Sequence, residues 1–320
     1  MPVVTVAADG LSAQVRGIEI GETGQHAGKS FWSVSVYDNR FEKRDGVWTI
    51  AAMRVTPRMR ADYAIGWAKD LPAIGGKAAY PKAASPRVRI AGTLAPRARR
   101  PGDLAAIRRD LAIAAAFDGA ENVSNAYGYF IDEFRWDDCA DLFSTDGWKE
   151  LSYIGTFVGR ERVRESMVNR YGRNGRGATF LAIHQKTQPY VTVAADGLRA
   201  SIRLRLFQFN SQREGDGSYI SGIYENQVKL ENGIWKLHGM DLDYVWLADY
   251  TGGWAAIEPG ASERFKPSPQ TIAKYPPDSP LRGVTFAPFP KIAPMGFHFR
   301  NPVSGRPPAL LLGWSDGRRG

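Results

Sequence analysis

The chain has 320 residues, of which 43% are hydrophobic, with a formal net charge of +9 and a single cysteine, Cys139. This length and composition predict about two globular domains, and one cysteine excludes an internal disulfide or a cysteine metal cage. The chain has no run of 18 apolar residues, so no membrane partner is expected. It also opens without a signal-peptide pattern, so we expect a cytoplasmic protein.

Residues 1–75 have strand character, and their sequence returns later in the chain. The octapeptide VTVAADGL stands at Val4–Leu11 and again at Val191–Leu198, and the match continues without a gap at the same spacing. Asp45-Gly46 supplies the positive φ that a two-residue hairpin turn needs, and Asn232-Gly233 is its counterpart. This internal repeat predicts that residues 1–75 form an incomplete sheet half-domain, of which the second copy is complete.

Residues 76–102 are predicted to be a basic linker rich in Pro, Ala and Gly. The stretch from Lys77 to Arg100 carries seven cations and no carboxylate. A basic linker of this kind is more often solvated than bound, and it lacks the interleaved aromatic residues of single-strand binders. We therefore expect no nucleic-acid partner.

Residues 103–257 are predicted to hold helices first and a sheet afterwards. Helical spacing follows the N-cap candidate Asp103, a second helix runs through NAYGYFIDEFR, and a third begins at WDDCADLF. The turn STDG is expected to end this helical part. A strand near Trp148–Ile154, the helix RERVRESMVNRY and four antiparallel strands within 178–245 complete the prediction.

Residues 258–320 form a Pro-rich C-terminal arm that includes FAPFPKIAPMGFHF. Proline has no amide donor, so such a segment is expected to lie over a surface and not to join a sheet. Its aromatic residues favour docking over disorder.

The order of these elements resembles the SnoaL-like branch of the nuclear transport factor 2 superfamily. Four stretches carry the resemblance: AYGYFIDEFRWDDCADLFSTDG, GRERVRES, HQKTQPYVTVAADG and ENGIWKL. It implies an α+β fold in which a curved antiparallel sheet wraps around helices into a cone with one pocket, beside an incomplete second copy. The tandem layout and Pro-rich tail resemble, more narrowly, bacterial diarylpropane lyases, which act on lignin-derived dimers without a cofactor and release formaldehyde.

The resemblance also implies catalytic roles for Tyr127, Asp132 and His184, which stand where dehydratase-like members carry a Tyr, an Asp and a His. A carboxylate and an imidazole in one pocket can act as a general acid/base pair, with either residue as the acid, and neither metal nor cofactor is needed. Four His without HxH or HExxH spacing also argue against a metal site. The structural alternatives are a solvated helix carboxylate, a satisfied strand histidine and a core tyrosine.

Substrate-binding candidates come from strand alternation and from comparing the two copies. Lys186 shares a strand face with His184, and Tyr153 could donate to a phenolate. Some candidates have identical counterparts in the first copy, which a shared scaffold would explain, whereas His238 and Asp241 have the different counterparts Ala51 and Arg54. The full set is Tyr153, Lys186, Arg203, Tyr224, Asn226, His238 and Asp241.

The leading functional hypothesis is a cofactorless lyase or dehydratase acting on a hydroxylated aromatic small molecule. In the diarylpropane version, loss of a benzylic hydroxyl gives a quinone methide, and formaldehyde then leaves to give a stilbene. The alternatives are an isomerase or cyclase in the same pocket, or a non-catalytic binding or assembly module. A homo-oligomer, either a dimer or a trimer, is also expected.

Overall fold

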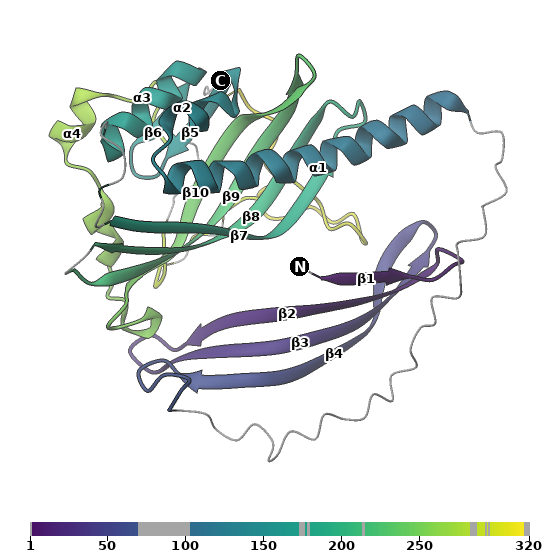
Figure 1. The fold of residues 1–320 in the computed structure, drawn as a ribbon, viewed down its shortest axis with the longest axis horizontal. Helices are drawn as coiled ribbons and strands as arrows, with labels where there is room; N and C mark the ends of the chain where they lie inside the picture. The colour runs from purple at the N-terminus through teal and green to yellow at the C-terminus, as the bar shows by residue number, and fades with distance from the viewer. Residues whose placement is uncertain are drawn as a thin grey trace. The chain divides into compact units, whose positions relative to one another are not determined.

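The computed structural model of this chain contains two sheets, each in its own unit (Figure 1). The structure describes residues 2–69, 103–172, 177, 180–212, 215–281, 287–291, 293 and 295–316. The first unit holds residues 2–69 and 302–305, and the second holds the other described residues. The predicted linker at 76–102 lies outside the described residues, and the domain boundaries at 75, 102 and 257 stay predictions.

The first unit is a four-stranded antiparallel sheet in the order β1-β2-β3-β4. No helix accompanies it among residues 2–69. The hairpin between β3 and β4 turns at Asp45-Gly46, where both residues have positive φ as a two-residue turn requires. The strands are β1 (Val3–Val6), β2 (Ser12–Gly24), β3 (Ser30–Arg44) and β4 (Val47–Asp62).

The second unit has a six-stranded sheet in the order β6-β5-β10-β9-β8-β7, and only β5 and β10 run parallel. Its strands are β5 (Phe143–Leu151), β6 (Gly155–Val158), β7 (Phe180–Val193), β8 (Arg199–Gln212), β9 (Gly217–Glu231) and β10 (Ile234–Asp249). Its helices are α1 (Leu104–Asp132), α2 (Trp136–Asp141), α3 (Arg160–Tyr171), α4 (Pro269–Lys274) and the 3-10 turns η1 (Trp254–Ala256) and η2 (Ala261–Phe265). Figure 1 shows α1 lying across one face of this sheet.

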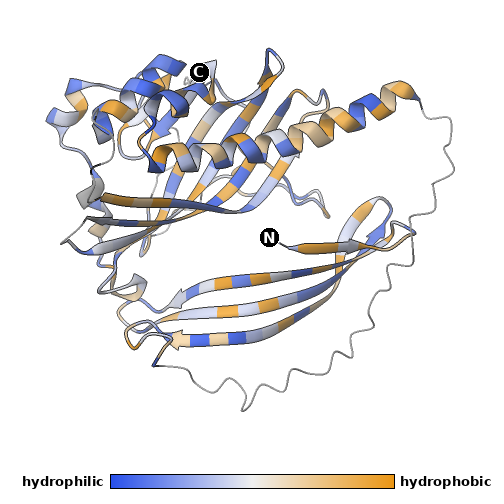
Figure 2. Cartoon of the chain, in the orientation of Figure 1, coloured by the Kyte–Doolittle hydropathy of each residue, from blue (hydrophilic) through white to orange (hydrophobic). Residues whose placement is uncertain are grey.

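The core of the second unit lies between that sheet face and the helices. Hydrophobic and hydrophilic residues follow one another along the strands (Figure 2), and the alternate residues that belong to the core lie on the face toward α1. Fully buried members include Tyr127 and Met167 from the helices and Leu204, Tyr224 and Met240 from the strands. Among the described ranges, no helix is both long enough and apolar enough to cross a membrane.

Two local predictions were wrong. The two helices expected before residue 136 are one helix, α1, which passes through Gly119. A Cβ at that position would lie 2.4 Å from the Trp235 ring, so the glycine serves close packing and does not break the helix. The predicted turn STDG lies inside β5, where Phe143 and Trp148 pair with Leu237 and Gly239 of β10, leaving the four residues as a bulge.

The internal repeat is a structural repeat. Strands β3 and β4 match β9 and β10 residue for residue at the spacing of the octapeptides. The pairing irregularities recur as well, since Ala51 of β4 and His238 of β10 are each skipped in their ladders. Because bulges bend and twist a sheet, both copies curve at the same place. The α+β fold with an incomplete second copy is thereby confirmed.

The two octapeptides differ in what covers them. Gly197 and Gly10 end equivalent turns, with φ of 67° and 69°. A Cβ on Gly197 would lie 2.9 Å from the Cβ of Ala112 in α1, whereas a Cβ on Gly10 would have no described atom within 4 Å. The same turn therefore supports a helix in the second unit and stands open among the described residues of the first.

Candidate active site

Asp132, the last residue of α1, and His184 in β7 are in direct contact. The carboxylate accepts a hydrogen bond from the backbone N–H of His184, with Oδ2 3.0 Å from the nitrogen, and its Oδ1 contacts the ring Nδ1. Gly128, one turn earlier in α1, lets the helix come this close, since a Cβ there would lie 3.3 Å from the carbonyl oxygen of His184. The side chains of Asp132 and His184 are 15% and 10% exposed, so this dyad borders solvent.

The electrostatics of the dyad favour a neutral imidazole. Burial lowers the pKa of His184, and the hydrogen bond to Asp132 offsets part of that effect. A neutral ring that donates from Nδ1 to the carboxylate keeps its lone pair on Nε2. The dyad can therefore present a base at Nε2, with Asp132 holding the ring in position.

Lys186 lies two residues from His184 on the same strand face, between two tyrosine rings. Its ammonium is 4.8 Å from the ring centre of Tyr127 and 4.5 Å from that of Tyr224, and it donates a hydrogen bond to the Ser124 carbonyl oxygen. Burial, together with the charge of Lys149, lowers the pKa of Lys186 to about 7. Burial also raises the pKa of Tyr127 and of Tyr224, so both phenols stay neutral hydrogen-bond donors near pH 7.

Lys149, which the sequence analysis missed, belongs to the same face. It pairs with Met240 across β5 and β10, and Met240 pairs with Asn226 across β10 and β9, so all three side chains point toward the helices. Burial lowers the pKa of Lys149 to about 8. The amide of Asn226 is buried and has no hydrogen-bond partner among the described residues.

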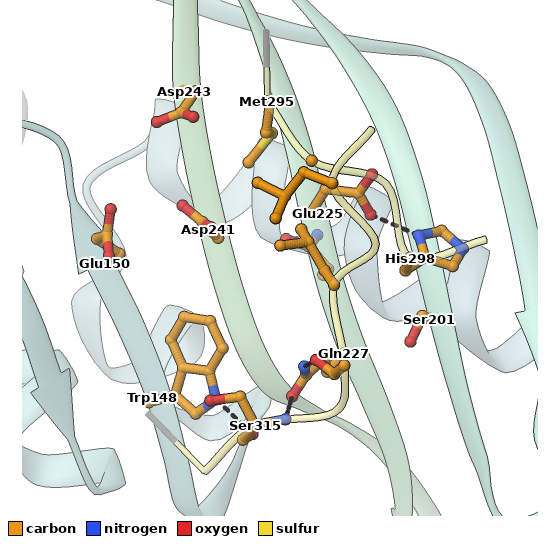
Figure 3. A pocket seen from close by; sticks show the side chains of 15 residues that line it. Trp148, Glu150, Ser201, Glu225, Gln227, Asp241, Asp243, Met295, His298 and Ser315 are labelled. Carbon is orange, nitrogen blue, oxygen red and sulfur yellow. Dashed lines mark hydrogen bonds and ion pairs between the residues drawn. The ribbon is translucent and has the colours of Figure 1, made fainter. Parts of the chain in front are cut away.

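Arg203 and Asp241 lie on the opposite face of the sheet, toward the C-terminal arm. That face and the arm enclose a cavity of about 250 Å³ (Figure 3). Arg203 pairs with Glu225 and donates to the Gly296 carbonyl oxygen at 2.8 Å, and Glu225 also pairs with His298 of the arm. These contacts make Arg203 a part of the attachment of the arm.

Three carboxylates share the wall of this cavity, from Glu150, Asp241 and Asp243. One oxygen from each lies within 4.8 Å of the others, a spacing at which a cation could bridge them. Burial, together with the charge of Glu150, raises the pKa of Asp243 to about 6. The expectation that no metal binds rested on histidine and cysteine spacing, so it did not address this group, and it stays a prediction.

The two remaining candidates are His238 and Tyr153. His238, the bulged residue of β10, stacks on Trp314 of the arm at 5.1 Å between ring centres and lies 3.4 Å from the Ser144 hydroxyl. Tyr153 has a φ of 68° in the turn after β5, and its ring centre is 6.3 Å from that of Tyr244.

The structure thus divides the predicted site residues by sheet face. Asp132, His184, Tyr127, Lys186, Tyr224 and Asn226 lie on or face the α1 side, whereas Arg203, His238 and Asp241 lie on the arm side. Lys149 escaped detection because a lysine in the short strand GWKEL gives no sign of which face it occupies. Its alternation with buried Trp148 and Glu150 was the available signal, but both neighbours are buried as well.

Comparison with known proteins agrees with the fold of the second unit. Residues 118–241 match the family model of the SnoaL-like domain. No match to a curated protein was found.

Solved structures with a similar fold each correspond to part of the chain. An aromatic ring hydroxylase candidate from Novosphingobium aromaticivorans is 23% identical, with a TM-score of 0.36 over 42% of this chain and 94% of its own. A candidate scytalone dehydratase from the same organism is 18% identical, with a TM-score of 0.38 over 45% and 91%. A hexachlorocyclohexane dehydrochlorinase from Novosphingobium barchaimii is 16% identical, with a TM-score of 0.38 over 47% and 99%. Residues 118–241 are therefore similar to the SnoaL-like domain, and the family match covers the part of the chain that holds the dyad.

Proposed function

We propose that the protein is a cofactor-independent lyase in which Asp132 and His184 carry out general acid–base catalysis. The observation that carries the proposal is the contact of the Asp132 carboxylate with both the backbone and the ring of His184. A base needs a defined orientation and a lone pair free to reach the substrate, and this contact supplies the first and leaves Nε2 for the second.

The surrounding groups suit an elimination. When a base removes a proton, negative charge develops on the substrate, and donors already in place lower the energy of that transition state. Lys186 and the phenols of Tyr127 and Tyr224 are such donors. Their aromatic rings also suit a substrate with an aromatic ring, because offset or edge-on ring contacts add to the burial of apolar area.

Within this class we propose a hydroxylated aromatic substrate, and more specifically a lignin-derived diarylpropane with hydroxyls at its benzylic and terminal carbons. Protonation of the benzylic hydroxyl, together with loss of the proton of a phenol para to it on the ring, releases water and leaves a neutral quinone methide. Removal of the terminal hydroxyl proton then breaks the carbon–carbon bond, so that formaldehyde leaves and the electron pair restores the phenolate, which takes back a proton. The products are one stilbene, one formaldehyde and one water, with no change in overall oxidation state.

The test is to incubate the purified protein with a panel of lignin-derived aromatic dimers without added cofactor and to measure formaldehyde and stilbene. We expect both products from wild type, with or without a chelator, and a large loss in Asp132→Asn. Turnover to a rearranged product of unchanged mass would favour an isomerase or cyclase. Tight binding without turnover would favour a non-catalytic binding module.

A further inference from the structure

We infer that the α1 side of the second sheet binds an aromatic substrate as its phenolate, with the anionic oxygen held by Lys149, Lys186 and the amide of Asn226. The inference concerns the same site as the proposed lyase and rests on that proposal for its place in the reaction. It adds a chemical class for the ligand and a role for Lys149, and it can be tested without turnover.

Charge balance is the first argument. The charged and titratable groups acting on Lys186 are Lys149, Cys139 and Asp132. Burial raises the pKa of the Cys139 thiol to about 12, so that group is neutral, and the carboxylate of Asp132 is already engaged by His184. The groups acting on Lys149 are Cys139, the carboxylates of Glu150 and Asp241, and the Arg170 guanidinium. Glu150 and Asp241 line the cavity on the other face of the sheet. On the α1 side, an anion placed between the two buried amines would favour their charged forms.

Unmet hydrogen bonding is the second argument. Asn226 is 1% exposed, and neither its amide nitrogen nor its amide oxygen has a partner among the described residues. A buried polar group without a partner costs about 1–3 kcal/mol. The Ser124 hydroxyl, beside the carbonyl that Lys186 contacts, is also buried without a described partner. A ligand oxygen that accepts from the Asn226 amide would remove part of this penalty.

The arrangement of the three groups is the third argument. Lys149 and Asn226 flank Met240 on neighbouring strands, and Tyr224 lies two residues from Asn226 on the same face. Met240 is an unbranched side chain that can change rotamer to admit a ligand atom. Lys186 reaches over the ring of Tyr224 from β7.

Aromatic walls decide between kinds of anion. The side chains of Tyr127, Tyr224 and Tyr244 contribute rings to this face, and rings pack well against a flat, delocalised anion. A phenolate also serves the proposed chemistry, because its electron pair can expel a benzylic hydroxyl to give the quinone methide. An aliphatic carboxylate would gain the charge interaction but not the ring contacts.

The experiment uses 4-nitrophenol, whose phenolate absorbs at longer wavelength than its neutral form, titrated into the full-length protein at a pH below the pKa of the probe. We expect bound probe to show the phenolate band and its methyl ether, 4-nitroanisole, to bind at least about tenfold more weakly. Lys149→Met and Asn226→Leu should each weaken probe binding by about tenfold. Lys274→Met, which removes an exposed lysine in α4, should leave it unchanged.

Bound probe that stays neutral, equal affinity for the ether, or tighter binding of an aliphatic carboxylate would each overturn the inference. The wild-type spectrum alone is decisive, so the test does not depend on whether a variant folds. A phenolate band without lyase turnover would contradict the proposed function but support the phenolate site. Lyase turnover without the band would support the proposed function but contradict the phenolate site.

Discussion

Asp132 holds His184 at two points, the backbone nitrogen at 3.0 Å and the ring Nδ1. The first contact fixes where β7 lies against the end of α1, and the second fixes the tautomer of the imidazole. One side chain therefore couples the packing of the helix to the direction in which the base points.

Removing either member of the dyad should abolish most activity without unfolding the protein. Asp132→Asn keeps the shape of the side chain but not its charge, and His184→Ala removes the base. Each should lower kcat by about 10² or more, the scale of a lost general base. The double variant should lose little beyond the worse single variant, because groups that act as a unit are not additive.

The measurement is turnover on a confirmed substrate, with folding checked by circular dichroism. The matched control is Asn39→Ala, the first-copy counterpart of Asn226, which should turn over substrate normally. Normal turnover in either dyad variant would contradict the proposed mechanism.

The pH dependence of kcat/KM should reflect a buried histidine. Burial lowers the pKa of His184, so the acid limb should fall below the ordinary imidazole value of about 6.5. The Asp132 carboxylate raises the pKa of His184, whereas Lys186 and Lys149 lower it. Residual activity of Asp132→Asn should therefore show an acid limb at still lower pH, and that of Lys186→Met a limb at higher pH. If the acid limb has the same midpoint pH in wild type, Asp132→Asn and Lys186→Met, a group other than His184 controls it.

Most of the fold could be predicted from the sequence because two copies of the same pattern support the same strand assignments. The repeat has no gap, and its Asp-Gly and Asn-Gly turns stand at the same position in each copy. A strand or hairpin assigned in one copy can therefore be checked against the other. The division of α1 into two helices was wrong, because the helix continues through Gly119, which packs against Trp235. The oligomeric state and the cytoplasmic location stay predictions.

The site was harder to predict because strand alternation groups residues by face but does not show which face packs against α1 and which against the arm. His184 and Lys186 could be grouped by alternation, and the structure brings them together with Asp132. Asp241 and Arg203 belong to the same strands as inward-facing residues, but they point to the arm. His238 shows a further difficulty, because the bulge it occupies disturbs the alternation from which a prediction would be made.

Stability should rise with pH on account of the two buried amines. The pKa of Lys186 is lowered to about 7 and that of Lys149 to about 8, whereas a lysine in the unfolded chain titrates near 10.4. Between these values the unfolded state binds more protons, so the free energy of unfolding increases as pH rises from about 7 toward 10. Urea denaturation across this range should show the slope, and it should be shallower in Lys186→Met and Lys149→Met. A slope as steep in both variants as in Lys274→Met would contradict the assignment.

The two octapeptide glycines offer a matched pair of substitutions. Gly10→Ala and Gly197→Ala both place a side chain at a left-handed φ, with a penalty of about 1–2 kcal/mol. Only Gly197→Ala also pushes a Cβ against Ala112, which should add about 1–3 kcal/mol of overpacking. Thermal unfolding should therefore show a larger loss for Gly197→Ala. An equal loss in the two variants would mean that α1 does not rest on this turn.

The repeat also has a consequence for how the chain folds. The VTVAADGL segment precedes and pairs with β2 in the first copy and β8 in the second, and these two strands occupy equivalent positions in the repeat. During folding, an octapeptide can pair with the strand of the other copy and form a misfolded intermediate, a failure typical of repeat proteins. Contact with Ala112 is made by only one of the two turns among the described residues. Packing of α1 against the Gly197 turn therefore favours the pairing of the second octapeptide with β8. Weakening this packing by Gly197→Ala should slow refolding, because the chain would more often form the exchanged pairing first.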